Sequence, residues 1–93
     1  MITSFKCKDT QRIWNGETSK KFPCDIQERA LNKLSAIDAV EDVWNLLIPP
    51  NNHLKRLEGN WFGYMSIRIN NQWRICFKWK QGDACDVIIC DYH

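Results

Sequence analysis

The sequence predicts one α+β domain over residues 1–93, in which helices cover one face of an antiparallel sheet of about four strands. One observation behind this prediction is the last third of the chain, residues 63–93, where apolar side chains recur at every second position, as in half-buried strands. Another is a succession of two amphipathic helix patterns between Asp25 and Pro49, which need an apolar surface to cover. The length of 93 residues is enough for a single modest hydrophobic core.

The alternation assigns the side chains of the predicted sheet to two faces. The apolar phase comprises Met65, Ile67, Ile69, Trp73, Ile75, Phe77, Trp79, Cys85, Val87 and Ile89. The opposite phase carries Ser66, Arg68, Arg74, Lys78 and Lys80. One face of the sheet is therefore expected to be apolar and the other basic.

Parity fixes the first hairpin, because residues paired across antiparallel strands point to the same face. A three-residue loop at 70–72 pairs Ile67 with Ile75 and keeps the apolar phase together, whereas a two-residue turn would mix the faces. This register sets Arg68 directly opposite Arg74, where like charges destabilise a sheet. A polyanion would relieve that repulsion; the alternative is that both arginines are simply solvated on an open sheet face.

The second hairpin follows the same rule, with residues 81–83 as its loop. The resulting pairs are Phe77 with Val87, Ile75 with Ile89, and Lys78 with Asp86. The last pair matches opposite charges, so this lysine is expected to have a structural partner. Arg68 and Arg74 are expected to have none.

A short strand and a short helix are expected at the start of the chain. Residues 2–6 read as a first strand. Asp9 can cap a short helix that stops at Gly16, a suitable residue to follow a helix C-terminus.

Two longer helices follow. Asp25 and Glu28 form a capping-box pattern, and the helix after it repeats apolar residues with the 3.6-residue period at Ile26, Ala30, Leu34 and Ile37. A second capping box, at Asp38 and Glu41, predicts a further helix with an apolar face made of Val40, Val43, Trp44 and Leu47. Pro49 and Pro50 end it. The apolar face of the sheet is the surface that these helices are expected to cover.

The composition is that of a globular protein, with 44% hydrophobic and 26% charged residues. The formal net charge of +2 is unevenly distributed. Residues 1–52 hold seven basic and seven acidic side chains, whereas residues 53–93 hold six basic and four acidic ones. The excess lies in the sheet half, which indicates an anionic partner for the sheet.

Several classes of protein are not indicated. No apolar run approaches the length of about 20 residues that spans a bilayer, and the first residues have no signal-peptide character, so a cytoplasmic protein without membrane contact is expected. The five cysteines are an odd number without a C-x-x-C motif, and there are only two histidines. Neither a disulfide framework nor a zinc site is indicated, and no metal or other cofactor is expected.

The C-terminal residues suggest a chemistry for an anionic partner. Cleavage of RNA can use the substrate's own 2′-hydroxyl as nucleophile, provided that the protein supplies a base, an acid and positive charge for the phosphate. Arg74 suits the charge role because planar guanidinium groups bind phosphate through two hydrogen bonds. His93 suits the acid or base, and Asp91 can act as base or orient a partner. The alternative is that a terminal histidine is exposed and inert.

A second basic cluster lies between the helices and the sheet. His53, Lys55 and Arg56 are expected beside the open face of the sheet, where they would contact phosphates. The alternative is a solvated, charged strand. The sequence has no internal repeat, glycine-rich phosphate loop or G-x-S-x-G motif.

Three motifs in this chain resemble those of the HigB-type toxins of the RelE/ParE superfamily. They are D-I-Q-x-R-A-L-x-K-L from Asp25, G-x-x-S-I-R-I-N-x-x-W-R-I-C-F from Gly63, and the final D-Y-H. The resemblance covers nearly the whole chain and implies a RelE-like single domain of a bacterial toxin–antitoxin system. It also implies cleavage of messenger RNA on the ribosome and inhibition by a HigA-type antitoxin with a helix-turn-helix domain. Operator DNA would be bound only through the complex with that antitoxin.

The resemblance also implies roles for individual residues. Arg74 matches an arginine that binds the scissile phosphate, and Asp91, Tyr92 and His93 match a catalytic triplet. The chain departs from the pattern L-K-G-D-R-x-G at residues 57–63. In that segment Glu58 stands where a lysine is expected, Asn60 replaces an acid, and Trp61 replaces an arginine. This reverses a charge beside the expected phosphate site. Either His53, Lys55 or Arg56 supplies the missing cation, or the enzyme is weakened or has a different specificity. Trp61 could instead stack on an exposed base.

The function expected from these observations is that of a metal-independent, ribosome-dependent endoribonuclease. Its catalytic residues would be Arg74, Asp91, Tyr92 and His93, with Tyr92 stacking on a base or helping to move the proton of the 2′-hydroxyl. Its RNA contacts would be Arg68, Lys55, Arg56, His53 and Trp61. The alternatives are a ParE-like toxin that binds gyrase without RNA chemistry, and a degenerate toxin that only binds the antitoxin. The sequence leaves the identity of the general base open.

Overall fold

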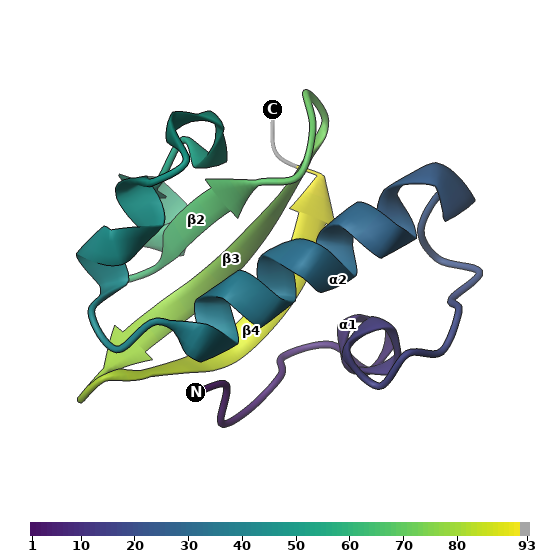
Figure 1. The fold of residues 1–93 in the computed structure, drawn as a ribbon, viewed down its shortest axis with the longest axis horizontal. Helices are drawn as coiled ribbons and strands as arrows, with labels where there is room; N and C mark the ends of the chain where they lie inside the picture. The colour runs from purple at the N-terminus through teal and green to yellow at the C-terminus, as the bar shows by residue number, and fades with distance from the viewer. Residues whose placement is uncertain (92–93) are drawn as a thin grey trace.

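The computed structural model of the chain describes residues 1–91, and Figure 1 shows their arrangement. The α-helices are α1 (Lys8–Trp14) and α2 (Cys24–Ala39). Short 3₁₀-helices are η1 (Val43–Leu47), η2 (Pro50–Asn52) and η3 (Gly59–Trp61). The strands are β1 (Lys55–Arg56), β2 (Met65–Arg68), β3 (Trp73–Lys80) and β4 (Asp83–Asp91).

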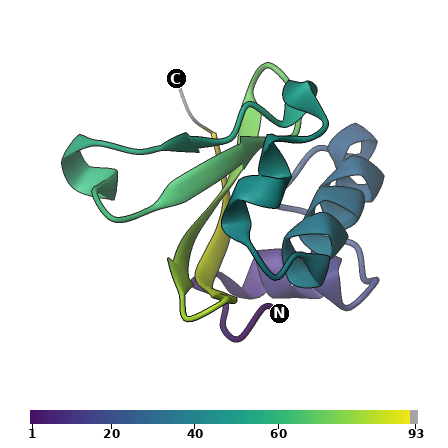
Figure 2. The same ribbon diagram turned by 60° about the vertical axis from the view of Figure 1, so that its left-hand side comes forward.

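The four strands form one antiparallel sheet in the order β1-β2-β3-β4, so each strand pairs with its neighbour in the sequence. The long helix α2 lies across one face of this sheet (Figure 1). The segment that carries η3 extends from the sheet on the side away from α2 (Figure 2). The predicted α+β architecture, with the helices on one face of four strands, is confirmed.

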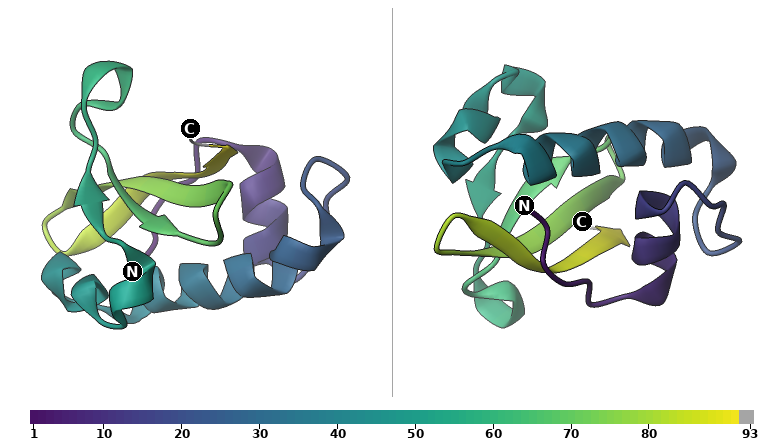
Figure 3. Two further views of the ribbon diagram at one scale, coloured as in Figure 1. Left: turned by 90° about the horizontal axis from the view of Figure 1, so that it is seen from above. Right: turned by 60° about the horizontal axis from the view of Figure 1, so that its bottom comes forward.

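The core lies between α2 and the sheet. The helix contributes Ile26, Ala30, Leu34 and Ile37, all buried. The sheet contributes Ile67, Ile69, Ile75, Phe77, Val87 and Ile89, also buried. Most of the apolar phase predicted for the strands therefore faces the helix. Cys85 is the exception, because it pairs with Lys78 beyond an irregularity of the ladder, and Ala84 takes its place in the core. Helix α1 lies beside α2 at the edge next to β4 (Figure 3).

The first hairpin has the predicted register. Ile67 pairs with Ile75 and Arg68 pairs with Arg74. Asn70 fixes the loop, because its side-chain oxygen accepts hydrogen bonds of 2.8 Å from the backbone amides that follow it by two and by three residues.

The second hairpin differs from the prediction in part. The pairing of Ile75 with Ile89 is confirmed, but the connection is a two-residue turn of Gln81 and Gly82, with φ angles of 52° and 84°. Positive φ at both central positions matches the twist of the flanking strands, which favours the shorter turn over the predicted loop at 81–83. The ladder then shifts register, and Asp86 has a φ of 52°.

The register shift changes two predicted pairs. Lys78 faces Cys85 in the ladder, so its predicted backbone pair with Asp86 is wrong. Phe77 lies at the shift, where it opposes both Asp86 and Val87 in place of Val87 alone. A β-bulge of this kind places an extra residue on one strand. The predicted charge pair exists nevertheless, with 3.7 Å between Lys78 Nζ and Asp86 Oδ2.

The start of the chain is less regular than predicted. In place of a strand at residues 2–6, two isolated parallel bridges join Ile2 to Ala84 and Phe5 to Val87. Helix α1 is present, but its N-cap is Cys7, and Asp9 lies in its first turn, where the carboxylate accepts a hydrogen bond of 2.8 Å from the Ser19 hydroxyl.

The predicted helix after Asp38 is wrong. Helix α2 continues to Ala39, and the carboxylate of Asp38 accepts a hydrogen bond of 2.8 Å from the Ile2 amide. The next helical turn is η1, in which Trp44 and Leu47 are 46% and 53% exposed. A 3₁₀-helix repeats every three residues, so η1 buries Leu46 together with Val43, which is three residues earlier.

Within residues 1–91, none of the helices combines the length and the apolar character that crossing a membrane requires.

Candidate nucleic-acid interface

The sheet face opposite α2 was predicted to be basic. In the structure a small apolar cluster covers part of that face. Leu57, Tyr64 and Cys76 are buried there. Trp61 packs on this cluster, with its ring 5.0 Å from that of Tyr64 in an edge-on arrangement, and the Lys6 ammonium group lies 5.3 Å from the indole. Trp61 is therefore half-buried, and one part of its side chain is already engaged within the protein.

Arg74 is the most buried basic side chain of this face, with 8% of its surface exposed. Its Nε donates a hydrogen bond of 2.9 Å to the hydroxyl of Ser66, which is fully buried. Its Nη2 donates one of 2.7 Å to the backbone carbonyl of His53. The expectation that Arg74 has no structural partner is wrong, because two neutral acceptors fix its orientation.

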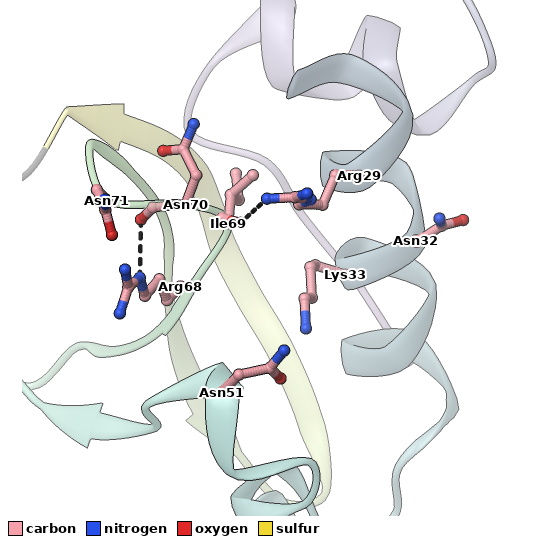
Figure 4. Close-up of a pocket in the computed structure, with 8 residues that line it drawn as sticks. All are labelled: Arg29, Asn32, Lys33, Asn51, Arg68, Ile69, Asn70 and Asn71. Carbon is pink, nitrogen blue, oxygen red and sulfur yellow. Dashed lines mark hydrogen bonds between the residues drawn. The ribbon is translucent and has the colours of Figure 1, made fainter. Parts of the chain in front are cut away.

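Arg68 pairs with Arg74 in the ladder but lies in different surroundings. Its Nε donates a hydrogen bond of 3.1 Å to the backbone carbonyl of Asn70, so the expectation that it has no partner is also wrong. It is half-buried and lines a cavity together with Arg29 and Lys33 of α2 (Figure 4). The two arginines are thus neighbours in the sheet that meet different parts of the molecular surface.

The second basic cluster is divided between the two sides of β1. His53 is exposed, has a φ of 47° and contributes its carbonyl to Arg74. Lys55 pairs with Ser66 and is close enough to the Cys76 thiol for its charge to act on the pKa of that group. The His53 backbone and Lys55 therefore lie near Arg74.

Arg56 is not brought to Arg74. Its guanidinium lies 5.2 Å from the centre of the Trp44 ring, and it lines a second cavity of about 330 Å³. Glu58 and Trp79 line the same cavity. The reversed charge at Glu58 therefore lies near Arg56, and its position beside a bound phosphate stays a prediction.

Asp91 ends β4 at the corner of the sheet nearest the first hairpin loop. It pairs with Trp73, is exposed, and its carboxylate accepts a hydrogen bond of 3.1 Å from the Gln72 amide group. Cys90, just before it, pairs with Arg74. The predicted catalytic residues Tyr92 and His93 directly follow Asp91 and lie outside the described residues.

Two cysteines that the sequence did not single out lie beside Arg74. The sulfur atoms of Cys76 and Cys90 are 2.8 Å apart. A hydrogen bond from Cys76 and the charge of Arg74 lower the pKa of the Cys90 thiol, although burial opposes them. The hydrogen bond to Cys90, together with burial, raises the pKa of the Cys76 thiol. The predicted pairing of Ile75 with Ile89 already puts both cysteines on the same face of neighbouring strands, a signal that could have revealed the pair.

The sequence analysis also missed the basic residues of α2. Arg29 and Lys33 are four residues apart, a spacing that puts like charges on the same side of a helix and that would have revealed them. They line a cavity of about 600 Å³. Among residues 1–91, no group of three or more His, Cys, Asp and Glu side chains is placed to hold a metal ion.

The four-stranded meander with its helices on one face is an α+β fold that also occurs in solved structures. Two solved structures of the YoeB-YefM toxin–antitoxin complex from Staphylococcus aureus contain chains with this fold, at TM-scores of 0.61 and 0.59 and 18% identity. In each comparison all of this chain and 98% of the other are covered. Residues 3–93 match the family described as the RelE-like toxin of type II toxin-antitoxin system HigB, and the chain belongs to that family.

Two relatives share about a third of their residues with this chain. Toxin HigB-1 of Vibrio cholerae is 33% identical over 90 residues, which cover 96% of this chain and 95% of that protein. Endoribonuclease HigB of Proteus vulgaris is 31% identical over 96 aligned positions, which cover the whole of both chains. The resemblance described for the sequence motifs is thereby confirmed.

Proposed function

We propose that this toxin is an endoribonuclease that cuts messenger RNA on the ribosome. The observation that carries the proposal is Arg74, a guanidinium held almost buried by Ser66 and the His53 carbonyl, with Lys55 beside it. A fixed cation of this kind suits a phosphate whose negative charge increases during reaction. The endoribonuclease name of the Proteus vulgaris relative supports the same activity.

The proposed reaction needs no protein nucleophile and no metal. The 2′-hydroxyl of the RNA attacks the neighbouring phosphate, a new bond forms between that oxygen and phosphorus, and the bond to the 5′ oxygen breaks. The products are a 2′,3′-cyclic phosphate and a free 5′-hydroxyl. The protein must accept the proton of the 2′-hydroxyl, donate one to the leaving 5′ oxygen, and stabilise the charge on the phosphate.

Arg74 would supply the charge stabilisation. Two of its nitrogens are held by Ser66 and His53, so the guanidinium loses little freedom when it meets the phosphate. Asp91, Tyr92 and His93 would handle the protons, with an imidazole as the group that changes charge near neutral pH. Lys55 would contact a neighbouring phosphate oxygen.

The proposed partners are the ribosome with its messenger and a HigA-type antitoxin with a helix-turn-helix domain, which would also carry the complex to operator DNA. The site of action would be the cytoplasm, where translation takes place. A binding surface for an antitoxin needs apolar side chains, and the exposed Trp44, Leu47, Ile48 and Phe62 provide them.

The proposal is tested with purified protein and ribosomes programmed with a defined messenger. Mapping of the fragment ends is expected to give 2′,3′-cyclic phosphates at one side of each cut and 5′-hydroxyls at the other. The same transcript without ribosomes is the control and is expected to stay intact. A messenger that remains uncut on programmed ribosomes, while expression of the protein still arrests growth, would overturn the proposal.

A further inference from the structure

A cavity between α2 and the first hairpin loop is separate from the Arg74 site. Figure 4 shows Arg29 extending from the helix toward the loop that follows β2, Lys33 extending toward the segment of Asn51, and Arg68 on the far wall. The cavity measures about 600 Å³. Asn51, Asn70 and Asn71 also line it, so its walls are polar and its charged groups come from two elements far apart in the sequence.

The charge of this cavity has one sign. Among residues 1–91, its lining contains three basic side chains and no acidic one. Burial and the charge of Arg29 lower the pKa of Lys33, so the two basic groups of the helix disfavour each other. A bound anion would reverse that effect, because a negative charge between two cations stabilises both.

The cations are oriented by neutral groups. Arg29 Nη1 donates a hydrogen bond of 3.3 Å to the Ile69 carbonyl, and Arg68 Nε donates to the Asn70 carbonyl at 3.1 Å. The Lys33 ammonium group donates to the side-chain oxygen of Asn52. Because these acceptors are carbonyl oxygens and not carboxylates, they hold the side chains in place and leave the positive charge uncompensated at the cavity.

The lining favours a nucleic acid over a protein as the anion. Of the described residues that line the cavity, only Ile69 is apolar, whereas the centre of a protein–protein interface is rich in apolar and aromatic side chains. The exposed apolar side chains of the described chain, such as Leu47 and Phe62, line no part of this cavity. Asparagine side chains can meet both phosphates and base edges.

Arg68 connects the cavity with the site of the proposed reaction. It pairs with Arg74 in the ladder, and opposite residues in antiparallel strands have Cα atoms about 5 Å apart. The two side chains therefore leave the sheet at neighbouring points, and a strand bound at the cavity would pass next to the Arg74 site.

We propose that the cavity binds the phosphate backbone of the RNA next to the bond that is cut, so that Arg29, Lys33 and Arg68 position the strand on Arg74. This inference rests on the proposed function. It assigns to α2 a role in RNA binding, and it extends the RNA-binding surface from the sheet to the helix that covers the opposite face.

The test uses an uncleavable probe, a short single-stranded RNA in which every ribose is 2′-O-methylated. Its dissociation constant is measured against salt concentration for the unmodified protein and for the double variant Arg29→Gln/Lys33→Gln. The double variant Lys8→Gln/Lys80→Gln is the matched control, because it removes the same charge from exposed positions on α1 and at the end of β3. Charge-preserving Arg29→Lys/Lys33→Arg, with thermal melts of all proteins, separates loss of charge from loss of fold.

Each phosphate contact to a single strand contributes about 0.7 to the slope of log affinity against log salt. The slope is therefore expected to fall by roughly 1.4 in Arg29→Gln/Lys33→Gln and to stay unchanged in the control and the charge-preserving variant. Equal slopes for Arg29→Gln/Lys33→Gln and the control would overturn the inference. Failure of the unmodified protein to bind the probe at ~20 mM salt would also overturn the inference.

Two further measurements distinguish RNA binding at the cavity from antitoxin binding there and from the proposed nuclease activity. If the cavity variant weakens binding of the antitoxin and leaves RNA binding unchanged, the cavity is a protein site and the inference fails. Cleavage of ribosome-bound messenger by the unmodified protein is measured in parallel. If the protein cuts the messenger but the salt slope of Arg29→Gln/Lys33→Gln is unchanged, the proposed function is supported and the inference fails. A reduced slope without any cutting leaves an RNA-binding cavity on a protein that is not a nuclease.

Discussion

Arg74 Nη2 lies 2.7 Å from the backbone carbonyl oxygen of His53, and this hydrogen bond ties β3 to the segment that leads into β1. The same guanidinium donates a hydrogen bond to the Ser66 hydroxyl on β2, the strand between β1 and β3. One side chain therefore links three neighbouring parts of the sheet. Arg74 therefore contributes to the fold as well as to the proposed reaction, so the stability of an Arg74 variant is measured together with its cleavage rate.

Arg74→Ala is expected to destabilise the protein. The substitution leaves the buried Ser66 hydroxyl and the His53 carbonyl without this donor, which costs about 1–3 kcal/mol. Arg68→Ala is the matched control, since it removes the opposing charge from a half-buried position, and its effect is expected to stay within about 0.5 kcal/mol. Urea unfolding of both variants measures the difference, and equal stabilities would show that the Arg74 hydrogen bonds contribute little.

Ser66→Ala is expected to slow cleavage while the protein stays folded. Without the hydroxyl, Arg74 Nε loses its acceptor and the guanidinium is less fixed, which is expected to lower the single-turnover rate roughly tenfold. The Nε proton of Arg74 should also exchange faster with water in NMR spectra, a readout that a purely structural serine would not change. Ser35→Ala, at an exposed position of α2, is the control. An unchanged rate and an unchanged exchange would remove Ser66 from the positioning of Arg74.

Cys90 is expected to react with iodoacetamide at a lower pH than an ordinary cysteine. Its pKa is lowered by the hydrogen bond from Cys76 and by Arg74, so the reactive thiolate is already populated as the pH rises toward the usual thiol range. Cys76→Ala removes the donor and is expected to shift the pH profile of Cys90 upward. Peptide mapping by mass spectrometry identifies the labelled cysteine, and a profile unaffected by Cys76→Ala would contradict this account of the pair.

Truncation after Asp91 is expected to abolish both cleavage and growth arrest. The described fold does not depend on the removed residues for its core, which lies between α2 and the sheet. Circular dichroism and antitoxin binding check that the shortened protein is folded. A folded truncated protein that still arrests growth would favour the alternative of a gyrase-binding toxin, which needs no proton-transfer groups.

The regular parts of this fold could be predicted because they depend on local periodicity. Alternation along residues 65–77 was sufficient to set Ile67 opposite Ile75 and Arg68 opposite Arg74, since a change of one residue would have moved every side chain to the other face. The buried stripe of α2 followed from the 3.6-residue period in the same way.

The remaining features depend on the backbone or on contacts between distant segments. The turn at Gln81 and Gly82 and the bulge near Asp86 both need positive φ angles at non-glycine residues, which composition does not reveal. The burial of Arg74 depends on a carbonyl 21 residues earlier in the chain. Parity placed Arg68 and Arg74 on one face, yet only the packing of α2 against the loop after β2 brings Arg68 to the cavity of Arg29.

The central claim is that Arg74 meets charge that develops on the phosphate during cleavage. Single-turnover cleavage of ribosome-bound messenger by Arg74→Ala, at protein concentrations that saturate the ribosome, tests it most directly. The account predicts a cleavage rate lower by about a hundredfold or more, with ribosome binding nearly unchanged, because loss of one preorganised donor acts on the transition state. A folded Arg74→Ala protein that cleaves at the normal rate would contradict it and would leave this arginine with a structural role alone.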